Sequence, residues 1–165
     1  MKNIVLIGMP GCGKSTIGRL VNSDTGLRFI DLDDYIVESN HMSIEEMFNQ
    51  GEEFFRDKET EAVKEVSRDS GIIISTGGGV IKREENMQRL KKNGVIIFVD
   101  RSPEKIIETL DDSVRPLLKD GVKRIFDLYK ERYELYKKYS DIVIFNNEEL
   151  EKSVNEVEDI IGLIK

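Results

Sequence analysis

Short apolar runs and amphipathic stretches alternate along the whole chain. The apolar runs predict strands over residues 3–7, 28–31, 72–75, 95–99 and 142–145. Apolar side chains at helical spacing predict helices over residues 14–22, 33–38, 43–48, 53–68, 83–92, 103–110, 122–139 and 148–164. This alternation is typical of an α/β fold with three layers, in which helices cover both faces of a parallel sheet.

Local signals support several of these boundaries. Ser43 precedes Glu46 by three residues, which is the spacing of a capping box. Pro103 follows Ser102 as a first-turn proline follows an N-cap. The polar stretch 111–121 joins two predicted helices, and we expect it to form a mobile lid.

The length and the charge balance limit the classes of function. A chain of 165 residues with 39% hydrophobic and 35% charged residues fits one globular domain, residues 1–165. The net charge of −7 disfavours nucleic acid and anionic lipid as partners. No apolar run reaches the ~20 residues of a membrane span, and the single Cys12 and single His41 predict neither a disulfide nor a zinc site. We therefore expect a cytoplasmic protein and, by default, a monomer.

A phosphate-binding motif follows the first predicted strand. The segment GMPGCGKS at residues 8–15 has the spacing G-x-x-x-x-G-K-S and opens a predicted helix, a context that disfavours a glycine-rich turn without a ligand. In such a loop the glycines let backbone N–H groups turn toward phosphate oxygens, Lys14 reaches the β- and γ-phosphates, and the Ser15 hydroxyl ligates Mg²⁺. We expect these loop residues to bind a nucleotide: Gly11, Cys12, Gly13, Lys14, Ser15 and Thr16. We assign no role to the Cys12 side chain.

The rest of the chain narrows the type of nucleotide-dependent reaction. A switch GTPase needs an N-K-x-D motif to read guanine, and no Asn of this chain is followed by Lys. A motor or a large ATPase needs a longer chain than 165 residues. Small-molecule kinases are the class that fits the length.

Acidic side chains follow the second predicted strand. By strand alternation Asp31 and Asp33 project to the same side, and the carboxyl end of a parallel strand places them beside the phosphate loop. Such a pair suits Mg²⁺ held through water and an acceptor hydroxyl held for in-line attack. The alternative for Asp33 is a helix cap, and Asp34 is the weakest candidate of the three.

Two further motifs are candidates for binding an anionic acceptor. Arg56 and Glu59 lie three residues apart on a predicted helix, where a carboxylate can orient a guanidinium toward another carboxylate, although such a pair is more often a surface ion pair. Three consecutive glycines, Gly77, Gly78 and Gly79, follow the third predicted strand, where they allow a close approach of the backbone to a ligand.

Together these motifs resemble one family, the shikimate kinases, in the nucleoside-monophosphate-kinase-like branch of phosphate-loop proteins. The resemblance covers essentially the whole chain, in the family's order and spacing. It rests on the loop 8–15, Asp31-x-Asp33, Gly51-Glu52-x-x-Phe55-Arg56-x-x-Glu59, Gly77-Gly78-Gly79, Arg115-Pro116-Leu117-Leu118 and Arg132-Tyr133-Glu134-Leu135-Tyr136. It implies a sheet order of 2-3-1-4-5, a substrate-binding segment at 31–62 and a lid at about 111–121.

The resemblance also implies an activity: transfer of the γ-phosphoryl group of ATP to the 3-hydroxyl of shikimate, giving shikimate 3-phosphate and ADP on the route to chorismate and the aromatic amino acids. Lys14 and the loop amides are implied to hold the phosphates, and Ser15 and Asp31 to arrange Mg²⁺ directly or through water. Arg115 is implied to come down on the phosphates as the lid closes.

On the acceptor side, Asp33 is implied to hold the hydroxyl, either as its base or only as the group that orients it. Arg56 and Arg132, with the backbone amides of Gly77, Gly78 and Gly79, are implied to bind the carboxylate and the ring hydroxyls. With Lys14 and Arg115, these arginines form the basic cluster that two anionic substrates require from a protein of net charge −7.

The chain departs from the family pattern at one position. Seven residues before Arg115, where the family often has an Arg that packs on adenine, this chain has Glu108, so the adenine contacts stay unassigned. Read without the family, Arg132 fits a solvated helix face and Arg115 a loop residue. The tyrosines at helical spacing predict packing: Tyr129, Tyr133 and Tyr136.

Two other functions stay open at this point. One is a kinase of another small hydroxy acid such as gluconate, because a carboxylate clamp that faces Asp33 suits hydroxy acids in general. The other is a nucleotide-binding regulator without turnover, which would have no need for the combination of Lys14, Ser15, Asp31, Asp33 and Arg115.

Overall fold

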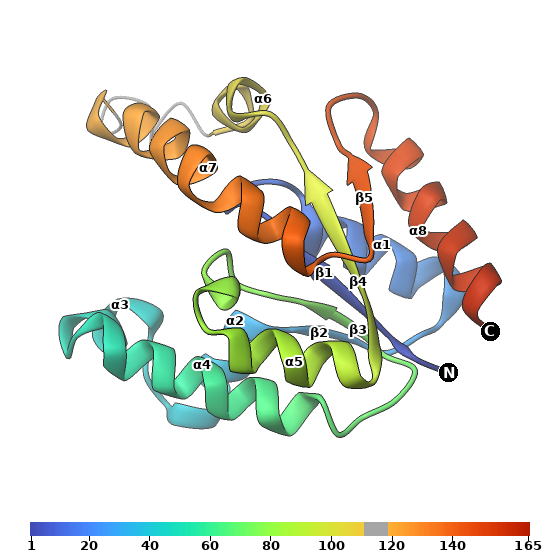
Figure 1. The fold of residues 1–165 in the computed structure, drawn as a ribbon, viewed down its shortest axis with the longest axis horizontal. Coiled ribbons are helices and arrows are strands. Elements are labelled where there is room, and N and C mark those ends of the chain that lie inside the picture. Colours follow the sequence, from blue (N-terminus) through green and yellow to red (C-terminus); the bar gives the residue numbers. More distant parts are fainter. Residues whose placement is uncertain (111–118) are drawn as a thin grey trace.

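Five parallel strands form the central layer of the computed structural model, which describes residues 1–110 and 119–165 (Figure 1). The strands are β1 (Asn3–Ile7), β2 (Phe29–Asp31), β3 (Ile73–Ser75), β4 (Gly94–Asp100) and β5 (Ile142–Phe145). Their order across the sheet is β2-β3-β1-β4-β5, and every neighbouring pair is parallel. The predicted α/β fold and the predicted sheet order are confirmed.

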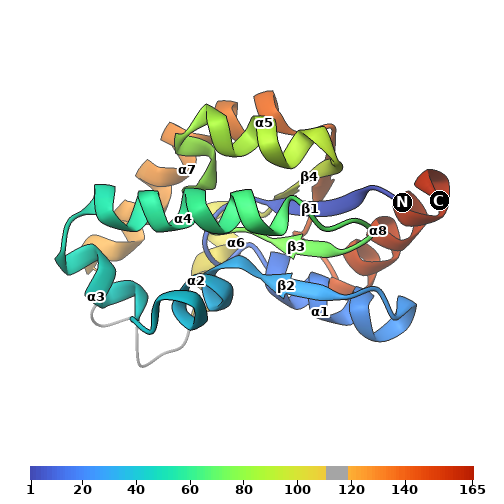
Figure 2. The ribbon, with the colours of Figure 1, turned by 90° about the horizontal axis from the view of Figure 1, so that it is seen from below.

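Helices cover both faces of this sheet (Figure 2). On one face lie α1 (Lys14–Thr25) and α8 (Leu150–Ile164), and on the other lie α4 (Glu52–Val66), α5 (Glu84–Lys92) and α7 (Lys119–Tyr139). Short helices complete the fold: α2 (Leu32–Asn40), α3 (Ile44–Asn49), the 3₁₀ helix η1 (Val80–Lys82) and α6 (Pro103–Glu108). In residues 1–110 and 119–165, no helix is both long and apolar enough to cross a bilayer.

Burial explains why β1 reads as a continuous apolar run. All residues of β1 are buried, because it lies between β3 and β4 with helices on both faces.

The two predicted helix caps, at Ser43 and Ser102, are confirmed. The Ser43 Oγ accepts a hydrogen bond from the Glu46 amide at 3.1 Å, and the Ser102 Oγ accepts one from the Lys105 amide at 3.3 Å.

The parallel register brings the carboxyl ends of the strands to one edge of the sheet. Ser75 at the end of β3 pairs with Leu6 of β1 on one side and with Asp31 of β2 on the other. The phosphate loop follows β1 directly at this edge, so the loop and the candidate acidic residues are neighbours.

The predicted lid, residues 111–121, is described only at its end. Residues 111–118, and with them Arg115, lie outside the described residues. Residues 119–121 are helical, since α7 begins at Lys119 rather than at the predicted position 122.

Candidate active site

The phosphate loop needs glycine for its backbone conformation. Gly11 and Gly13 have φ angles of 79° and 93°, in the left-handed region that other residues rarely adopt. Gly13 directly precedes α1, and a Cβ added to it would lie 2.6 Å from the Asn146 Nδ2. Both the positive φ angle and the lack of room for a Cβ atom therefore favour glycine at position 13.

Lys14 and Cys12 are held inside the loop. The Lys14 side chain is only 7% exposed, and its Nζ donates a hydrogen bond to the Met9 carbonyl at 3.1 Å. The Cys12 amide donates to the same carbonyl, also at 3.1 Å, and the Cys12 side chain is fully buried. The Lys14 Nζ also lies 3.9 Å from the Cys12 Sγ.

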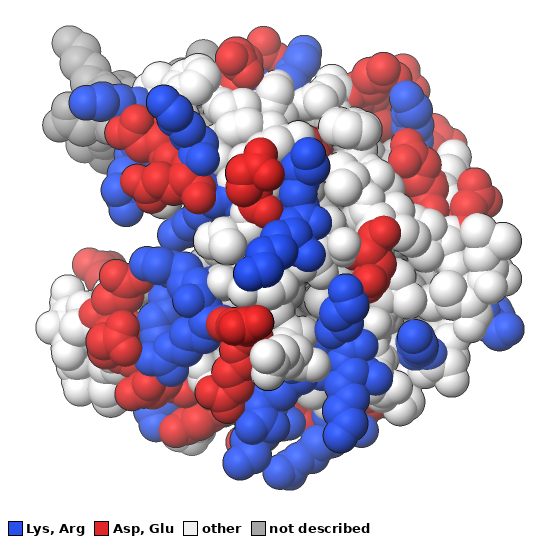
Figure 3. Space-filling view, viewed as in Figure 1, with Lys and Arg blue, Asp and Glu red and all other residues white. Residues whose placement is uncertain are grey.

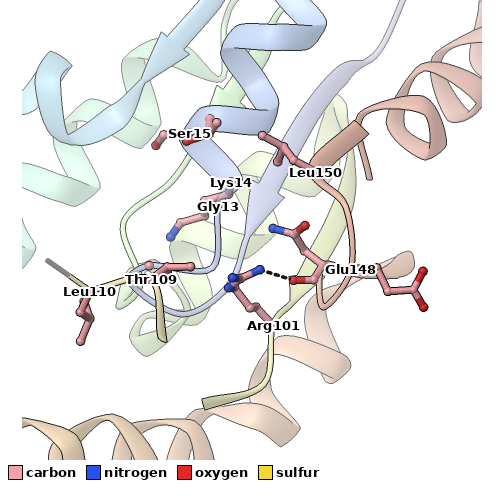
Figure 4. Close-up of a pocket in the computed structure, with 11 residues that line it drawn as sticks. Gly13, Lys14, Ser15, Arg101, Thr109, Leu110, Glu148 and Leu150 are labelled. Carbon is pink, nitrogen blue, oxygen red and sulfur yellow. Dashed lines mark hydrogen bonds between the residues drawn. The ribbon is translucent and has the colours of Figure 1, made fainter. Parts of the chain in front are cut away.

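A cleft of about 530 Å³ opens beside the phosphate loop (Figure 4). Five of the six predicted loop residues line it: Gly11, Gly13, Lys14, Ser15 and Thr16. Residues that the sequence analysis did not assign form the rest of the lining: Arg101, Thr109, Leu110, Asn146, Glu148 and Leu150. The cleft therefore continues from the phosphate loop to a second wall, which is suited to the remainder of a nucleotide.

Hydrogen bonds fix this second wall to the loop. Arg101 donates to the Asn146 carbonyl at 2.6 Å, the dashed line in Figure 4, and to the Lys105 carbonyl at 3.3 Å. The Asn146 Nδ2 donates to the Cys12 carbonyl at 2.8 Å. Asn146 lies directly after β5, at the same sheet edge as the loop, and that position is the signal by which the sequence could have identified it.

Ser15 connects the loop to two neighbouring strand ends. Its hydroxyl donates to the Asp31 Oδ2 at 2.7 Å and is hydrogen-bonded to the Ser75 hydroxyl at 2.8 Å. This set of hydroxyl and carboxylate oxygens fits Mg²⁺, which prefers oxygen ligands and retains several waters. The residues present are thus compatible with the predicted metal.

Asp33 does not follow the strand alternation that predicted its orientation. β2 ends at Asp31, and α2 begins at Leu32, so Asp33 lies in the first turn of a helix. The alternative of a capping role for Asp33 is wrong too, because the Asp31 carboxylate is the cap and accepts from the amides of Asp33 and Asp34 at 3.1 and 3.3 Å.

The Asp33 carboxylate nevertheless reaches the candidate site. Its Oδ1 is buried and has no hydrogen-bond partner among the described residues. Burial raises the pKa of Asp33 above its ordinary value, and the negative charge of Asp31 raises it further, while the positive charges of Lys14 and Arg56 oppose this. Asp33 is therefore a buried acceptor within electrostatic reach of both the phosphate loop and Arg56.

Arg56 and Glu59 form a buried ion pair rather than a surface pair. The Arg56 Nη1 lies 2.8 Å from the Glu59 Oε1, and the Glu59 side chain is fully buried. The rings of Phe55 and Phe48 lie 5.1 and 5.8 Å from the guanidinium carbon. Burial raises the pKa of Glu59, while Arg56 opposes this shift. These contacts restrict the orientation of the guanidinium.

The three glycines after β3 leave room for the charged side chains of the site. A Cβ at Gly77 would lie 3.0 Å from the Asp33 Oδ1 and 3.2 Å from the Glu59 Oε2, and a Cβ at Gly79 would overlap the Arg56 guanidinium. Neither glycine has a positive φ, so space rather than torsion selects glycine here. The glycines allow side chains, and not only a ligand, to approach the backbone.

Helix α7 contributes Arg132 and Tyr136 from the other side. An Nη1 atom of Arg132 lies 3.3 Å from the position of a Gly78 Cβ, and its charge acts on Glu59. The hydroxyl of the fully buried Tyr136 donates to the Gly78 carbonyl at 2.6 Å. Figure 3 shows the surface hollowed between α7 and the pair α3–α4. Close approaches and mutual charge effects relate a group of residues that we name the acceptor site: Asp33, Arg56, Glu59, Gly77, Gly78, Gly79 and Arg132.

Comparison with known proteins connects this geometry to a family. A family model described as shikimate kinase matches residues 10–161. A curated relative named shikimate kinase, from Clostridium botulinum (strain Alaska E43 / Type E3), is 50% identical over 162 residues, which cover 98% of each chain. Another, from Caldicellulosiruptor saccharolyticus, is 45% identical over 83% of this chain and 82% of its own.

Solved structures agree with the sequence comparison. A shikimate kinase from Acinetobacter baumannii in complex with shikimate superposes with a TM-score of 0.90 at 29% identity, over 100% of this chain and 95% of its own. A shikimate kinase from Aquifex aeolicus superposes with a TM-score of 0.81 at 32% identity, over 97% and 96% of the two chains.

Proposed function

The chain belongs to the shikimate kinase family, and from that membership we propose that it transfers the γ-phosphoryl group of ATP to the 3-hydroxyl of shikimate. The observation that carries this proposal is the buried Oδ1 of Asp33, which has no hydrogen-bond partner in the part of the chain that the structure describes. It lies within the electrostatic reach of Lys14 in the phosphate loop and of Arg56 in the acceptor site. A hydroxyl bound at Asp33 is thus placed between a phosphoryl donor and a group that binds its carboxylate.

The phosphate-loop cleft supports the nucleotide side of the proposal. Lys14 and the amides of the loop hold the phosphates, and the loop opens α1, whose N-terminus adds a favourable dipole. Ser15 and, directly or through water, Asp31 would hold Mg²⁺, which would supply positive charge to the phosphates. The wall formed by Arg101, Asn146 and neighbouring residues bounds the nucleoside.

The acceptor site supports the identity of the second substrate. Arg56, held by Glu59 at 2.8 Å, and Arg132 bind the shikimate carboxylate from α4 and α7. Asp33 accepts the hydrogen bond of the attacking hydroxyl and so orients its oxygen toward the γ-phosphorus. A kinase of gluconate or a regulator without turnover lacks a specific observation in its favour.

The proposal has three further parts, which concern Arg115, the substrate-binding segment, and the location and oligomeric state of the protein. Arg115 supplies positive charge to the transferred phosphoryl group when the lid of residues 111–121 closes. Residues 31–62 form the substrate-binding segment of a single domain that spans residues 1–165. The protein acts as a cytoplasmic monomer.

The test is ADP release by the purified protein with ATP and Mg²⁺, in the presence of shikimate, gluconate, quinate or no acceptor. We expect release with shikimate alone. Release with another acid alone would move the assignment to that acid, and ATP binding without release would favour the regulator. The Lys14→Ala variant serves as the control for the site, since wild-type turnover in it would contradict the placement of the phosphates.

A further inference from the structure

A second cleft opens where α4 and α5 end, and basic side chains line it. Its volume is about 440 Å³, and its lining consists of Lys64, Ser67, Arg68, Arg89, Lys92 and Asn93. No carboxylate belongs to that lining, although the chain as a whole carries a net charge of −7. Figure 3 shows Lys and Arg side chains gathered over the ends of α4 and α5, in the lower part of the view. We name this cavity the α4–α5 cleft.

The positive charge of this cleft is poorly neutralised. Arg89 pairs with Glu85 at 3.1 Å, but Lys64, Arg68 and Lys92 form no ion pair with any side chain that the structure describes. Nearby acids are bound to other groups: Asp69 to Arg28 at 3.0 Å, Glu61 to Lys58 at 3.2 Å, Glu65 to the Tyr35 hydroxyl at 2.6 Å and Asp141 to Lys91 at 3.1 Å. Lys64, Arg68 and Lys92 therefore remain available to an external anion.

Helix termini account for only part of this arrangement. Cations are favourable in the last turn of a helix, which explains Lys64 in α4 and Arg89 and Lys92 in α5. Arg68 lies beyond the end of α4, so the effect of the last helical turn does not account for it. The helix dipoles alone do not explain why basic side chains from two helices meet at one cavity whose lining has no acidic side chain.

Backbone and side-chain hydrogen bonds hold the turn that carries Ser67 and Arg68 of the cleft. The amides of Ser67, Arg68 and Asp69 donate to carbonyls of the last turn of α4 at 3.0–3.2 Å, so those carbonyls are already paired. The Asn93 Nδ2 donates to the Asp69 carbonyl and to the Ser70 hydroxyl, at 2.9 Å each. The basic side chains thus project from a fixed framework.

The α4–α5 cleft is separate from the active site. Asn93 directly precedes β4, and residues 67–70 precede β3, so the cleft lies at the amino edge of the sheet. The phosphate loop and the acceptor site lie at the carboxyl edge. We propose that the α4–α5 cleft binds a small polyanion that carries two or more phosphate or carboxylate groups.

Nuclear magnetic resonance tests this proposal on the full chain. The ¹⁵N-labelled protein is titrated with inorganic pyrophosphate and, separately, with citrate, in Mg²⁺-free buffer with saturating adenylyl imidodiphosphate and shikimate to fill the active site. We expect saturable amide shifts at residues 64–70 and 89–93 but not at residues 11–16. Binding of either probe supports the proposal, and the tighter one identifies the preferred group.

The variants separate a specific cleft from general attraction. The double variant Arg68→Gln/Lys92→Gln should raise the dissociation constant at least about tenfold, while Lys130→Gln/Lys165→Gln, which removes the same charge from exposed positions elsewhere, should not. Absence of saturable shifts at about 10 mM of both probes, or equal binding by the two double variants, would overturn the proposal. Turnover of shikimate is measured separately, so the two proposals fail independently.

Discussion

At the residue scale, the ionised Asp33 carboxylate lowers the free energy of unfolding. Its Oδ1 is buried and has no partner in residues 1–110 and 119–165. Burial, together with the charge of Asp31, raises the pKa of Asp33 above the ordinary value of 3.8. The folded protein therefore binds a proton at Asp33 more readily than the unfolded chain does. The free energy of unfolding must decrease as the pH rises from the ordinary pKa through the raised one. The ionised form is the stronger acceptor for a hydrogen bond from a hydroxyl group.

Replacing Asp33 by Asn should separate stability from activity. Because the amide is neutral, we expect Asp33→Asn to raise the free energy of unfolding by about 1 kcal/mol and Tm by about 2–4 °C at pH 7. The gain should vanish below pH 3.8, where the wild-type side chain is protonated in both states. The value of kcat should fall by about 10²-fold or more. Calorimetry and ADP release provide the measurements.

Asp34→Asn is the matched control, because Asp34 is the exposed neighbour of Asp33. Both its Tm and its kcat should stay near the wild-type values. A lower Tm for Asp33→Asn at pH 7 would mean that the carboxylate stabilises the fold, contrary to its buried and unpartnered environment.

Arg132 supplies the second prediction at this scale. It reaches Gly78 from α7 and acts on the buried Glu59, so it belongs to the acceptor site rather than to a solvated helix face. Loss of a charge-assisted contact costs about 1.5–3 kcal/mol, so Arg132→Ala should raise the KM for shikimate about ten- to hundredfold and leave the KM for ATP unchanged. Arg124→Ala, an exposed arginine of the same helix, is the control. An unchanged KM for shikimate would mean that Arg132 lies on a solvated helix face and does not bind the acceptor.

At the scale of elements, α7 is attached to the sheet edge by two tyrosines. The Tyr129 hydroxyl donates to the Asp100 Oδ1 at 3.0 Å, and the Tyr136 hydroxyl donates to the Gly78 carbonyl at 2.6 Å. The Tyr136 ring also stacks on Phe98, with centroids 5.0 Å apart. Arg132 lies between these two attachments, so its position depends on both.

Tyr136→Phe should therefore affect the acceptor more than the nucleotide. The variant retains the ring but leaves the Gly78 carbonyl unpaired, and we expect the KM for shikimate to rise several-fold while the KM for ATP stays constant. Burial raises the pKa of Tyr136 to about 12, so the hydroxyl remains a donor and the effect should be the same from pH 6 to 9. Tyr133→Phe is the control. Equal increases in both KM values would indicate a general loss of packing.

Strands and helix boundaries could be predicted from the sequence where neighbouring residues alone determine them. The apolar run of β1 and the caps at Ser43 and Ser102 depend on neighbouring residues, and they were predicted correctly. The orientation of Asp33 was not, because the cap at Asp31 ends β2 and begins α2 within one residue. The periodicity of apolar side chains does not indicate the residue at which the strand ends and the helix begins.

Long-range contacts were the other part that the sequence could not supply. The tyrosine spacing predicted packing for Tyr136, and its ring does pack, but the hydrogen bond to Gly78 joins residues 58 apart. Arg101 and Asn146, on the wall of the phosphate-loop cleft, are 45 residues apart. Without the resemblance, Arg56 and Glu59 read as a surface pair, because burial of Glu59 depends on the tertiary structure.

At the scale of the whole molecule, the two ends of the chain are built into one core. β1, the first element, is the central strand between β3 and β4. α8, the last element, packs against α1 on the same face of the sheet (Figure 1). The phosphate-loop cleft itself combines residues that follow β1 with Asn146 and Leu150 near the C-terminus. The elements β1 and α8 are therefore parts of the same packed structure.

This arrangement predicts that the protein unfolds in one cooperative step, as a single domain does. Calorimetry should show one transition with an enthalpy of about 115 kcal/mol near 60 °C and a calorimetric enthalpy equal to the van't Hoff value. Since adenylyl imidodiphosphate with Mg²⁺ binds only the folded chain, a concentration of 100 times its Kd should add about 2.7 kcal/mol and move the whole transition upward by about 5–10 °C. Two transitions, only one of which shifts with the nucleotide, would show that part of the chain unfolds separately. The acceptor site, built from α2, α4, α7 and the glycines after β3, could then unfold while the phosphate loop stays folded, contrary to the shared core that joins them.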